Sequence, residues 1–80
     1  MITYLKKKEV TDKVIVYNYS GNEDNIDGTV RLIRGDMETP PQFTPATGDE
    51  YLYFARQATF AIVGFIRNNE FPETHMRAIG

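Results

Sequence analysis

Cysteine is absent from this chain of 80 residues, and so is tryptophan. Without cysteine the fold has no disulfide bond, and a zinc site built on thiolate ligands is excluded. The absence is compatible with a reducing cytosol. A domain of this length buries only a modest fraction of its surface, so its stability depends on a well-packed core or on a partner.

Long apolar runs are also missing. The longest apolar-rich stretch, Phe60 to Ile66, is interrupted by Gly64 and bounded by Arg67. It is far shorter than the roughly 20 residues that a membrane-spanning helix needs. The first residues do not resemble a signal peptide, because the basic residues follow the apolar ones and no apolar core comes after them. We therefore expect a cytoplasmic protein with no membrane contact.

Neither sign of charge dominates the chain. The formal net charge is −2 and the isoelectric point is about 5.2. This balance gives no general attraction to a phosphate backbone, and a dedicated nucleic-acid-binding domain usually carries a basic excess. The hydrophobic fraction of 41% is ordinary for a globule and too high for a disordered chain. We expect residues 1–80 to form a single folded domain.

Three segments have the composition of β-strands. Ile2 to Lys6 is a short β-prone run, and Lys13 to Tyr19 (KVIVYNY) is rich in β-branched and aromatic residues. Ser20-Gly21-Asn22 ends the second run, Asp27-Gly28 marks a turn, and Thr29 to Arg34 is the third candidate strand. The pattern predicts a hairpin with a polar connection of about six to eight residues.

The stretch from residue 36 to residue 47 is the least regular part of the sequence. Pro40, Pro41 and Pro45 remove backbone donors and restrict the residues before them to extended conformations. We expect residues 39–45 to form an extended, semi-rigid linker in which Phe43 is the anchor.

A helix is predicted from about Gly48 to Asn68. Thr47 to Glu50 (TGDE) fits a capping box, with Thr47 as the N-cap and Glu50 reaching back to it. Asn68-Asn69 suits the end of the helix, and Pro72 prevents its continuation. One continuous arc of the helix is apolar, and its members are Tyr51, Phe54, Ala55, Ala58, Ile62, Phe65 and Ile66.

These elements predict an α+β fold. The sheet is expected to be small and mostly antiparallel, with three or four strands and one long helix on one face. The last strand is placed in the tail, from Thr74 to Ile79. The predicted order is β-β-β-α-β.

The acidic loop over residues 22–28 contains part of a calcium-binding pattern. If Glu23 is position 1 of an EF-hand loop, Asn25 and Asp27 fall at positions 3 and 5. Gly28 then falls at position 6. Position 12 is Arg34, where a bidentate carboxylate is needed. We therefore expect a solvated loop with Asx-type turns.

Other recognisable chemistry is sparse. His75 is the only histidine and Ser20 the only serine, and neither lies in a GxSxG, HxH or HExxH context. Glu73 is the only acidic residue close to His75 in the sequence. The glycines are separated and form no phosphate-binding loop. We expect no catalytic residue, no metal site and no cofactor.

The tyrosines leave two interpretations open. On the run from Lys13 to Tyr19, Ile15, Tyr17 and Tyr19 share one face and alternate with Val14, Val16 and Asn18. An exposed aromatic face beside Arg31 would suit the stacking of single-stranded RNA. Tyrosines turned toward the helix would instead be core residues.

The predicted helix has more apolar surface than one small sheet face covers. Its apolar arc spans about 200°, wider than the stripe of an ordinary surface helix. Tyr53, Phe60 and Gly64 also align within the otherwise polar strip. The surplus is covered either by the rest of the chain or by a second subunit. The residues expected at a contact between subunits are Leu52, Tyr53, Phe60, Val63 and Gly64.

The sequence names no substrate or partner, and it favours a non-enzymatic protein-interaction or structural module that self-associates as a homodimer. One alternative is a nucleic-acid-associated regulator, suggested by Lys6 to Lys8 and opposed by the acidic isoelectric point. The other is a small ligand-binding protein or enzyme whose site a second subunit completes. The residues expected to line that site are Phe43, Tyr51 and Tyr53, with Glu50 or His75.

Overall fold

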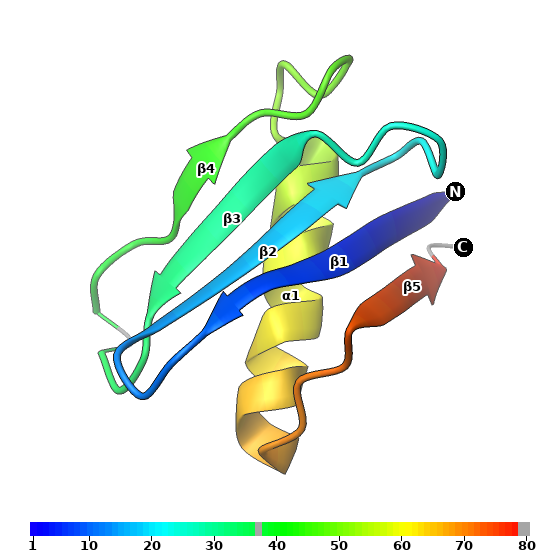
Figure 1. Cartoon of the computed structure of the whole chain (residues 1–80). Coiled ribbons are helices and arrows are strands. Elements are labelled where there is room, and N and C mark those ends of the chain that lie inside the picture. The colour runs from blue at the N-terminus through cyan, green and yellow to red at the C-terminus, as the bar shows by residue number, and fades with distance from the viewer. Residues whose placement is uncertain (37, 79–80) are drawn as a thin grey trace.

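A five-stranded antiparallel sheet with one helix across one face makes up the fold (Figure 1). The computed structural model describes residues 1–36 and 38–78. The elements in chain order are β1 (Ile2–Val10), β2 (Val14–Ser20), β3 (Gly28–Ile33), β4 (Gln42–Thr44), α1 (Tyr53–Asn68) and β5 (Thr74–Ala78). The predicted α+β class is confirmed. The order is β-β-β-β-α-β, so the sheet has one strand more than the sequence predicted.

The strands are arranged β4-β3-β2-β1-β5. β1 pairs with β5 from Ile2 to Lys6 and with β2 as far as Val10. The pairing with β2 explains why β1 continues beyond its predicted end at Lys6. A register shift between Lys7 and Glu9 interrupts the β1–β2 ladder as a bulge. The tail strand forms from Thr74 to Ala78, and Ile79 lies outside the described residues.

The additional strand, β4, lies within the proline-rich linker. Its three residues pair with β3, so that Phe43 lies opposite Val30. Phe43 is half-buried and packs against the core, as its predicted role of anchor requires. The extended conformation predicted for residues 39–45 is found in Gln42–Thr44. Thr39 instead lies in a bend, where its N–H group donates a 3.2 Å hydrogen bond to Oδ1 of Asp36.

The core lies between α1 and the inner face of the sheet. Ile15, Tyr17 and Tyr19 on β2 are fully buried, with zero exposed area. Ala55 and Ala58 present small side chains to the sheet, so the helix approaches closely enough to cover the two tyrosine rings. The remaining buried apolar residues are Leu5, Val30, Leu32, Ala46, Ala61, Ile62 and Phe65. The tyrosine face of β2 is thus the face that meets the helix.

The predicted capping box at Thr47 is wrong. The helix begins at Tyr53, after Leu52 in a left-handed conformation with φ of 60°. The carboxylate of Asp49 instead accepts hydrogen bonds from the N–H groups of Phe54 and Ala55, both at 3.0 Å. Gly48, with φ of 82°, turns the chain before the helix starts, so Thr47 cannot reach the first turn.

The predicted end of the helix is confirmed. Asn69 adopts the left-handed conformation of a C-cap, with φ of 52°. Its N–H group donates to the carbonyl of Ile66, and the N–H group of Glu70 donates to the carbonyl of Phe65. These bonds satisfy carbonyl groups that the last turn leaves free.

Candidate functional site

The five residues predicted to form an interaction surface are separated by the structure. Leu52 packs against the core, and Val63 lines a cavity of about 180 Å³ between α1 and the linker. Tyr53, Phe60 and Gly64 lie on the side of the helix away from the sheet, and Phe60 is 57% exposed. We refer to Tyr53, Phe60 and Gly64 as the helix stripe.

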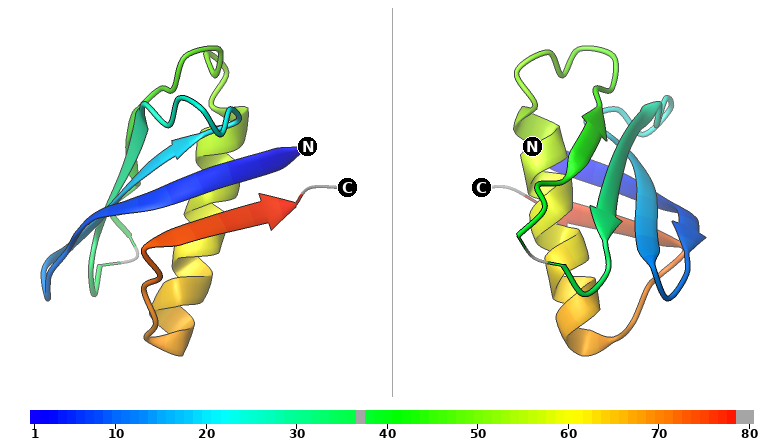
Figure 2. Two further views of the ribbon diagram at one scale, coloured as in Figure 1. Left: turned by 45° about the vertical axis from the view of Figure 1, so that its right-hand side comes forward. Right: turned by 90° about the vertical axis from the view of Figure 1, so that its left-hand side faces the viewer.

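The helix stripe borders β5. The guanidinium carbon of Arg77 lies 5.9 Å from the centroid of the Phe60 ring, within the range of a cation–π contact. Nε of Arg77 also donates a 3.2 Å hydrogen bond to Oε1 of Gln57 on the same helix. The views in Figure 2 show β5 and α1 beside each other at this side of the molecule.

β5 is one of the two edges of the sheet, and its hydrogen-bonding pattern follows from one contact. The N–H group of Lys7 donates to the carbonyl of Glu73 at 2.8 Å. Hydrogen-bonded pairs alternate along an antiparallel ladder, so His75 and Arg77 also face β1 with their peptide groups. The peptide groups of the intervening residues point away from β1 and into solvent. These residues, Thr74, Met76 and Ala78, form what we call the β5 edge.

The two edges of the sheet differ in how they are protected. β4, at one end, is only three residues long and lies between Pro41 and Pro45. Short strands and proline are common devices against edge-to-edge pairing. β5, at the other end, has five residues, contains neither proline nor lysine, and exposes 63% of Met76. Of the two edge strands in the described part of the chain, β5 is therefore the less protected.

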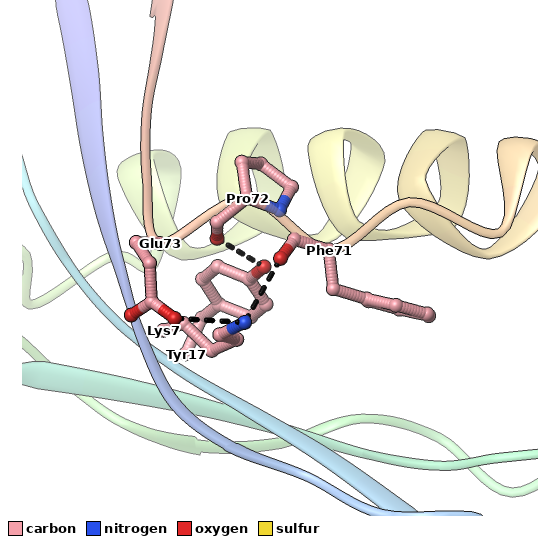
Figure 3. Close-up of polar contacts among 5 residues, drawn as sticks. All are labelled: Lys7, Tyr17, Phe71, Pro72 and Glu73. Carbon is pink, nitrogen blue, oxygen red and sulfur yellow. Dashed lines mark hydrogen bonds and ion pairs between the residues drawn. The ribbon is translucent and has the colours of Figure 1, made fainter.

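A polar cluster holds the segment that leads into β5 (Figure 3). Nζ of Lys7 lies 3.0 Å from Oε1 of Glu73 and donates a 3.0 Å hydrogen bond to the carbonyl of Phe71. The hydroxyl of Tyr17 donates to the carbonyl of Pro72 at 2.7 Å. Burial, and secondarily the charge of Glu73, raises the pKa of Tyr17 to about 12. The cluster therefore anchors this segment to the sheet, and its polar groups are engaged in that anchorage.

His75 lies beside this cluster on the helix side of the sheet. Its ring makes an edge-to-face contact with Phe65, with centroids 5.0 Å apart. It borders an open hollow of about 490 Å³ whose other lining residues are Phe65, Asn68, Glu70, Phe71 and Pro72. Ser20 pairs with Tyr4, which pairs in turn with Met76, so strand alternation directs Ser20 to the face opposite His75. The only serine and the only histidine therefore form no catalytic pair.

The ligand pocket expected between linker and helix has a different lining. The cavity there is bounded by Leu32, Asp36, Thr39, Pro41, Thr59 and Val63. Tyr51 is 86% exposed, and neither it nor Phe43 or Tyr53 lines this cavity. At about 180 Å³ it is smaller than the roughly 300–1,000 Å³ of common small-molecule sites.

The basic run and the tyrosines do not combine into one surface. Tyr17 and Tyr19 are buried beneath the helix, so they offer no stacking platform to RNA. Lys6 and Lys8 are exposed, whereas the intervening Lys7 is half-buried in its contacts with Glu73 and Phe71. The features that suggested a nucleic-acid partner therefore lie apart.

The acidic loop serves the fold through Asp27. Its carboxylate accepts hydrogen bonds from the backbone N–H and the hydroxyl of Thr47, and these bonds lower the pKa of Asp27. Thr47 thus fixes the end of the linker to the loop. Nowhere in residues 1–36 and 38–78 do three or more histidine or acidic side chains converge in a group suited to a metal ion.

Three comparisons with known proteins complete the description of the site. No protein-family model, no curated protein and no solved structure matches the chain. Over its described part, the structure contains no helix of the length and apolarity needed to cross a membrane.

Proposed function

We propose that this chain is a non-enzymatic protein-interaction module that self-associates through the β5 edge. The observation that carries the proposal is the difference between the two edges of the sheet. β4 is short and flanked by prolines, whereas β5 presents the peptide groups of Thr74, Met76 and Ala78 to solvent. An open, unprotected edge strand is a template for pairing with another strand.

The composition of the β5 edge supports the same proposal. Met76, on the face of the sheet away from the helix, is an exposed apolar residue at the centre of the strand. Methionine is common at protein interfaces, because its flexible side chain adapts to the partner. A small core also gains stability when part of its exposed apolar surface is covered by a second subunit.

The polar groups support a role other than catalysis. Lys7, Tyr17 and Glu73 hold the segment before β5, and Tyr19 and Asp49 hold the start of the helix. An acid–base or nucleophilic site needs polar groups that converge on a space where a substrate sits. Here the hydrogen bonds of these groups go to the protein's own backbone and side chains.

The experiment uses proline at position 76. The N–H group of Met76 points away from β1, so Met76→Pro removes an edge donor without breaking a hydrogen bond of the sheet. The wild type is expected to be a dimer by light scattering, and Met76→Pro a folded monomer by light scattering and circular dichroism. Met76→Thr, which keeps the N–H group and favours strands, is the matched control and should remain a dimer.

Two results would overturn the proposal. The first is a wild-type protein that stays monomeric at high micromolar concentration. The second is a folded Met76→Pro variant that dimerises as well as the wild type. In that case the helix stripe, where Phe60 is most exposed, becomes the better candidate for the contact.

A further inference from the structure

The β5 edge is complementary to itself in more than one register. Two copies of β5 that pair antiparallel must bring outward-pointing peptide groups opposite each other. Within the described residues, these groups belong to Thr74, Met76 and Ala78. In three registers, at least two outward-pointing residues of one copy lie opposite outward-pointing residues of the other copy. The centres of symmetry of these registers lie at His75, at Met76 and at Arg77.

The register centred on His75 uses the edge incompletely. It pairs Thr74 with Met76 of the second copy, and Ala78 then falls opposite Pro72. Proline has no N–H group, so that pair cannot exchange both hydrogen bonds. One of the outward-pointing residues therefore remains only partly paired.

The register centred on Arg77 has a different defect. It pairs Met76 with Ala78 of the second copy. It also places the two Arg77 side chains directly opposite each other. Like charges at directly opposed positions destabilise a sheet.

The register centred on Met76 uses the whole edge. Met76 pairs with Met76, and Thr74 pairs with Ala78 in both directions, so every outward-pointing peptide group of the described strand is satisfied. His75 of each copy lies opposite Arg77 of the other, and no pair of arginines is opposed. We infer that the partner of the β5 edge is a second copy of this chain, antiparallel, with its two-fold axis at Met76. This inference rests on the proposed function and adds the arrangement of the two copies.

This arrangement has a defined shape. A two-fold axis perpendicular to the sheet joins the two five-stranded sheets into one continuous sheet and leaves both helices on the same face. The two β4 strands then form the outer edges, where Pro41 and Pro45 limit further pairing. The assembly therefore closes at two copies.

Single cysteines introduced into this cysteine-free chain test the register. In the Met76-centred register, positions 75 and 77 of different copies form a non-hydrogen-bonded pair with Cα atoms about 4.5 Å apart, within reach of a disulfide. Mixing His75→Cys with a size-tagged Arg77→Cys protein under mild oxidation should give the mixed disulfide. Met76→Cys should link to itself, because its Cα atoms lie about 5.5 Å apart. Thr74→Cys is the control and should not self-link, because its partner position is 78.

The outcomes separate the register from the proposed function. Preferential self-linking of His75→Cys or of Arg77→Cys, with little mixed product, would assign one of the other two registers and overturn this inference. A wild-type dimer that Met76→Pro abolishes, but in which no cysteine pair links, would also overturn the register and leave the β5 edge as the contact. A monomeric wild type would overturn both. Circular dichroism of each variant confirms that the fold is retained.

Discussion

The hydroxyl group of Tyr19 in β2 donates a 2.7 Å hydrogen bond to Oδ2 of Asp49, in the turn before α1. The same hydroxyl accepts a 3.1 Å hydrogen bond from the N–H group of Ala46. The Asp49 carboxylate accepts in turn from the first N–H groups of the helix. Tyr19, Ala46 and Asp49 are all buried. One phenol therefore joins the sheet, the end of the linker and the start of the helix.

Tyr19→Phe should destabilise the protein by about 1–3 kcal/mol, because the buried Ala46 N–H loses its acceptor and Asp49 loses a donor. Urea titration measures the change. Tyr53→Phe, which removes a hydroxyl from a partly exposed ring, should change the free energy of unfolding by only a few tenths of a kcal/mol. Equal costs for the two variants would contradict the role given to the Tyr19 hydroxyl.

Asp49→Ala should cost about 0.5–2 kcal/mol or more, since it leaves two N–H groups of the first helical turn without their acceptor. Thr47→Ala should cost less, because its hydroxyl bonds to exposed Asp27 and not to the helix. Thr47→Ser should be nearly silent. A larger loss of unfolding free energy for Thr47→Ala than for Asp49→Ala would restore Thr47 as the helix cap.

Two glycines should respond in opposite directions to the same change. A Cβ atom at Gly28 would lie 2.5 Å from the Tyr19 ring and 2.7 Å from the Ala46 nitrogen, so Gly28→Ala should cost about 1–3 kcal/mol. A Cβ atom at Gly64 would meet nothing within 4 Å. Gly64→Ala should therefore stabilise the helix by about 0.5–1 kcal/mol. Thermal unfolding of both variants beside the wild type provides the comparison, and equal shifts would disprove the close packing at Gly28.

Alkaline pH should unfold the protein through its buried tyrosines. Burial, and secondarily Glu73, raises the pKa of Tyr17 to about 12, and burial raises the pKa of Tyr19 in the same direction. In the unfolded chain a tyrosine titrates near pH 10, so the unfolded state loses its proton first. The stability contributed by Tyr17 is therefore fully present below about pH 10 and is lost as pH rises through about 12.

As pH rises from about 10 to about 12, the urea midpoint of unfolding should fall for the wild type. It should fall less for Tyr17→Phe, which has no phenol to lose a proton at this position. Tyr51→Phe is the matched control, because Tyr51 is 86% exposed, and it should keep the full decline. A Tyr17→Phe variant with the same alkaline decline as the wild type would show that Tyr17 does not contribute to it.

Phe60→Glu distinguishes the helix stripe from the β5 edge as the contact between copies. The new carboxylate would lie beside Arg77, which approaches the Phe60 ring, so the variant should fold normally. If β5 carries the contact, light scattering should show the dimer retained in Phe60→Glu and lost in Met76→Pro. The opposite pair of results would move the contact to the helix stripe, where the sequence-based hypothesis located it.

The regular elements were predictable because local pattern and tertiary packing agree there. β2 alternates fully buried and partly buried residues from Val14 to Tyr19, and α1 carries an apolar face that the sheet covers. β4 was not predictable, because three residues between prolines carry no strand signal. β4 forms because the side chain of Phe43 packs against the core and the backbone of β4 pairs with β3.

The helix cap at Asp49 and the β5 edge were less predictable, because both depend on how distant parts of the chain come together. Asp49 accepts from N–H groups five and six residues later, across a turn that contains the left-handed Leu52. A side-chain helix cap usually binds N–H groups two or three residues later, so the sequence pattern did not indicate this one. The β5 edge depends on which end of the sheet each strand occupies, and β5 itself is too short to mark that end. The one available signal was the clustering of prolines around residues 40–45 and their absence from Thr74–Ala78.

The pairing of β1 with β5 also sets the order in which the sheet is completed. Leu5 lies opposite His75, so this ladder joins segments from the two ends of the described chain. β5 follows α1 in the chain, so β1 can gain its second neighbour only after α1 has been synthesised. Contacts of such long sequence separation carry a loop-closure cost and slow folding. We expect β1–β2–β3 to form early as a meander and β5 to add last, so the edge assigned to self-association is also the last part of the fold to mature.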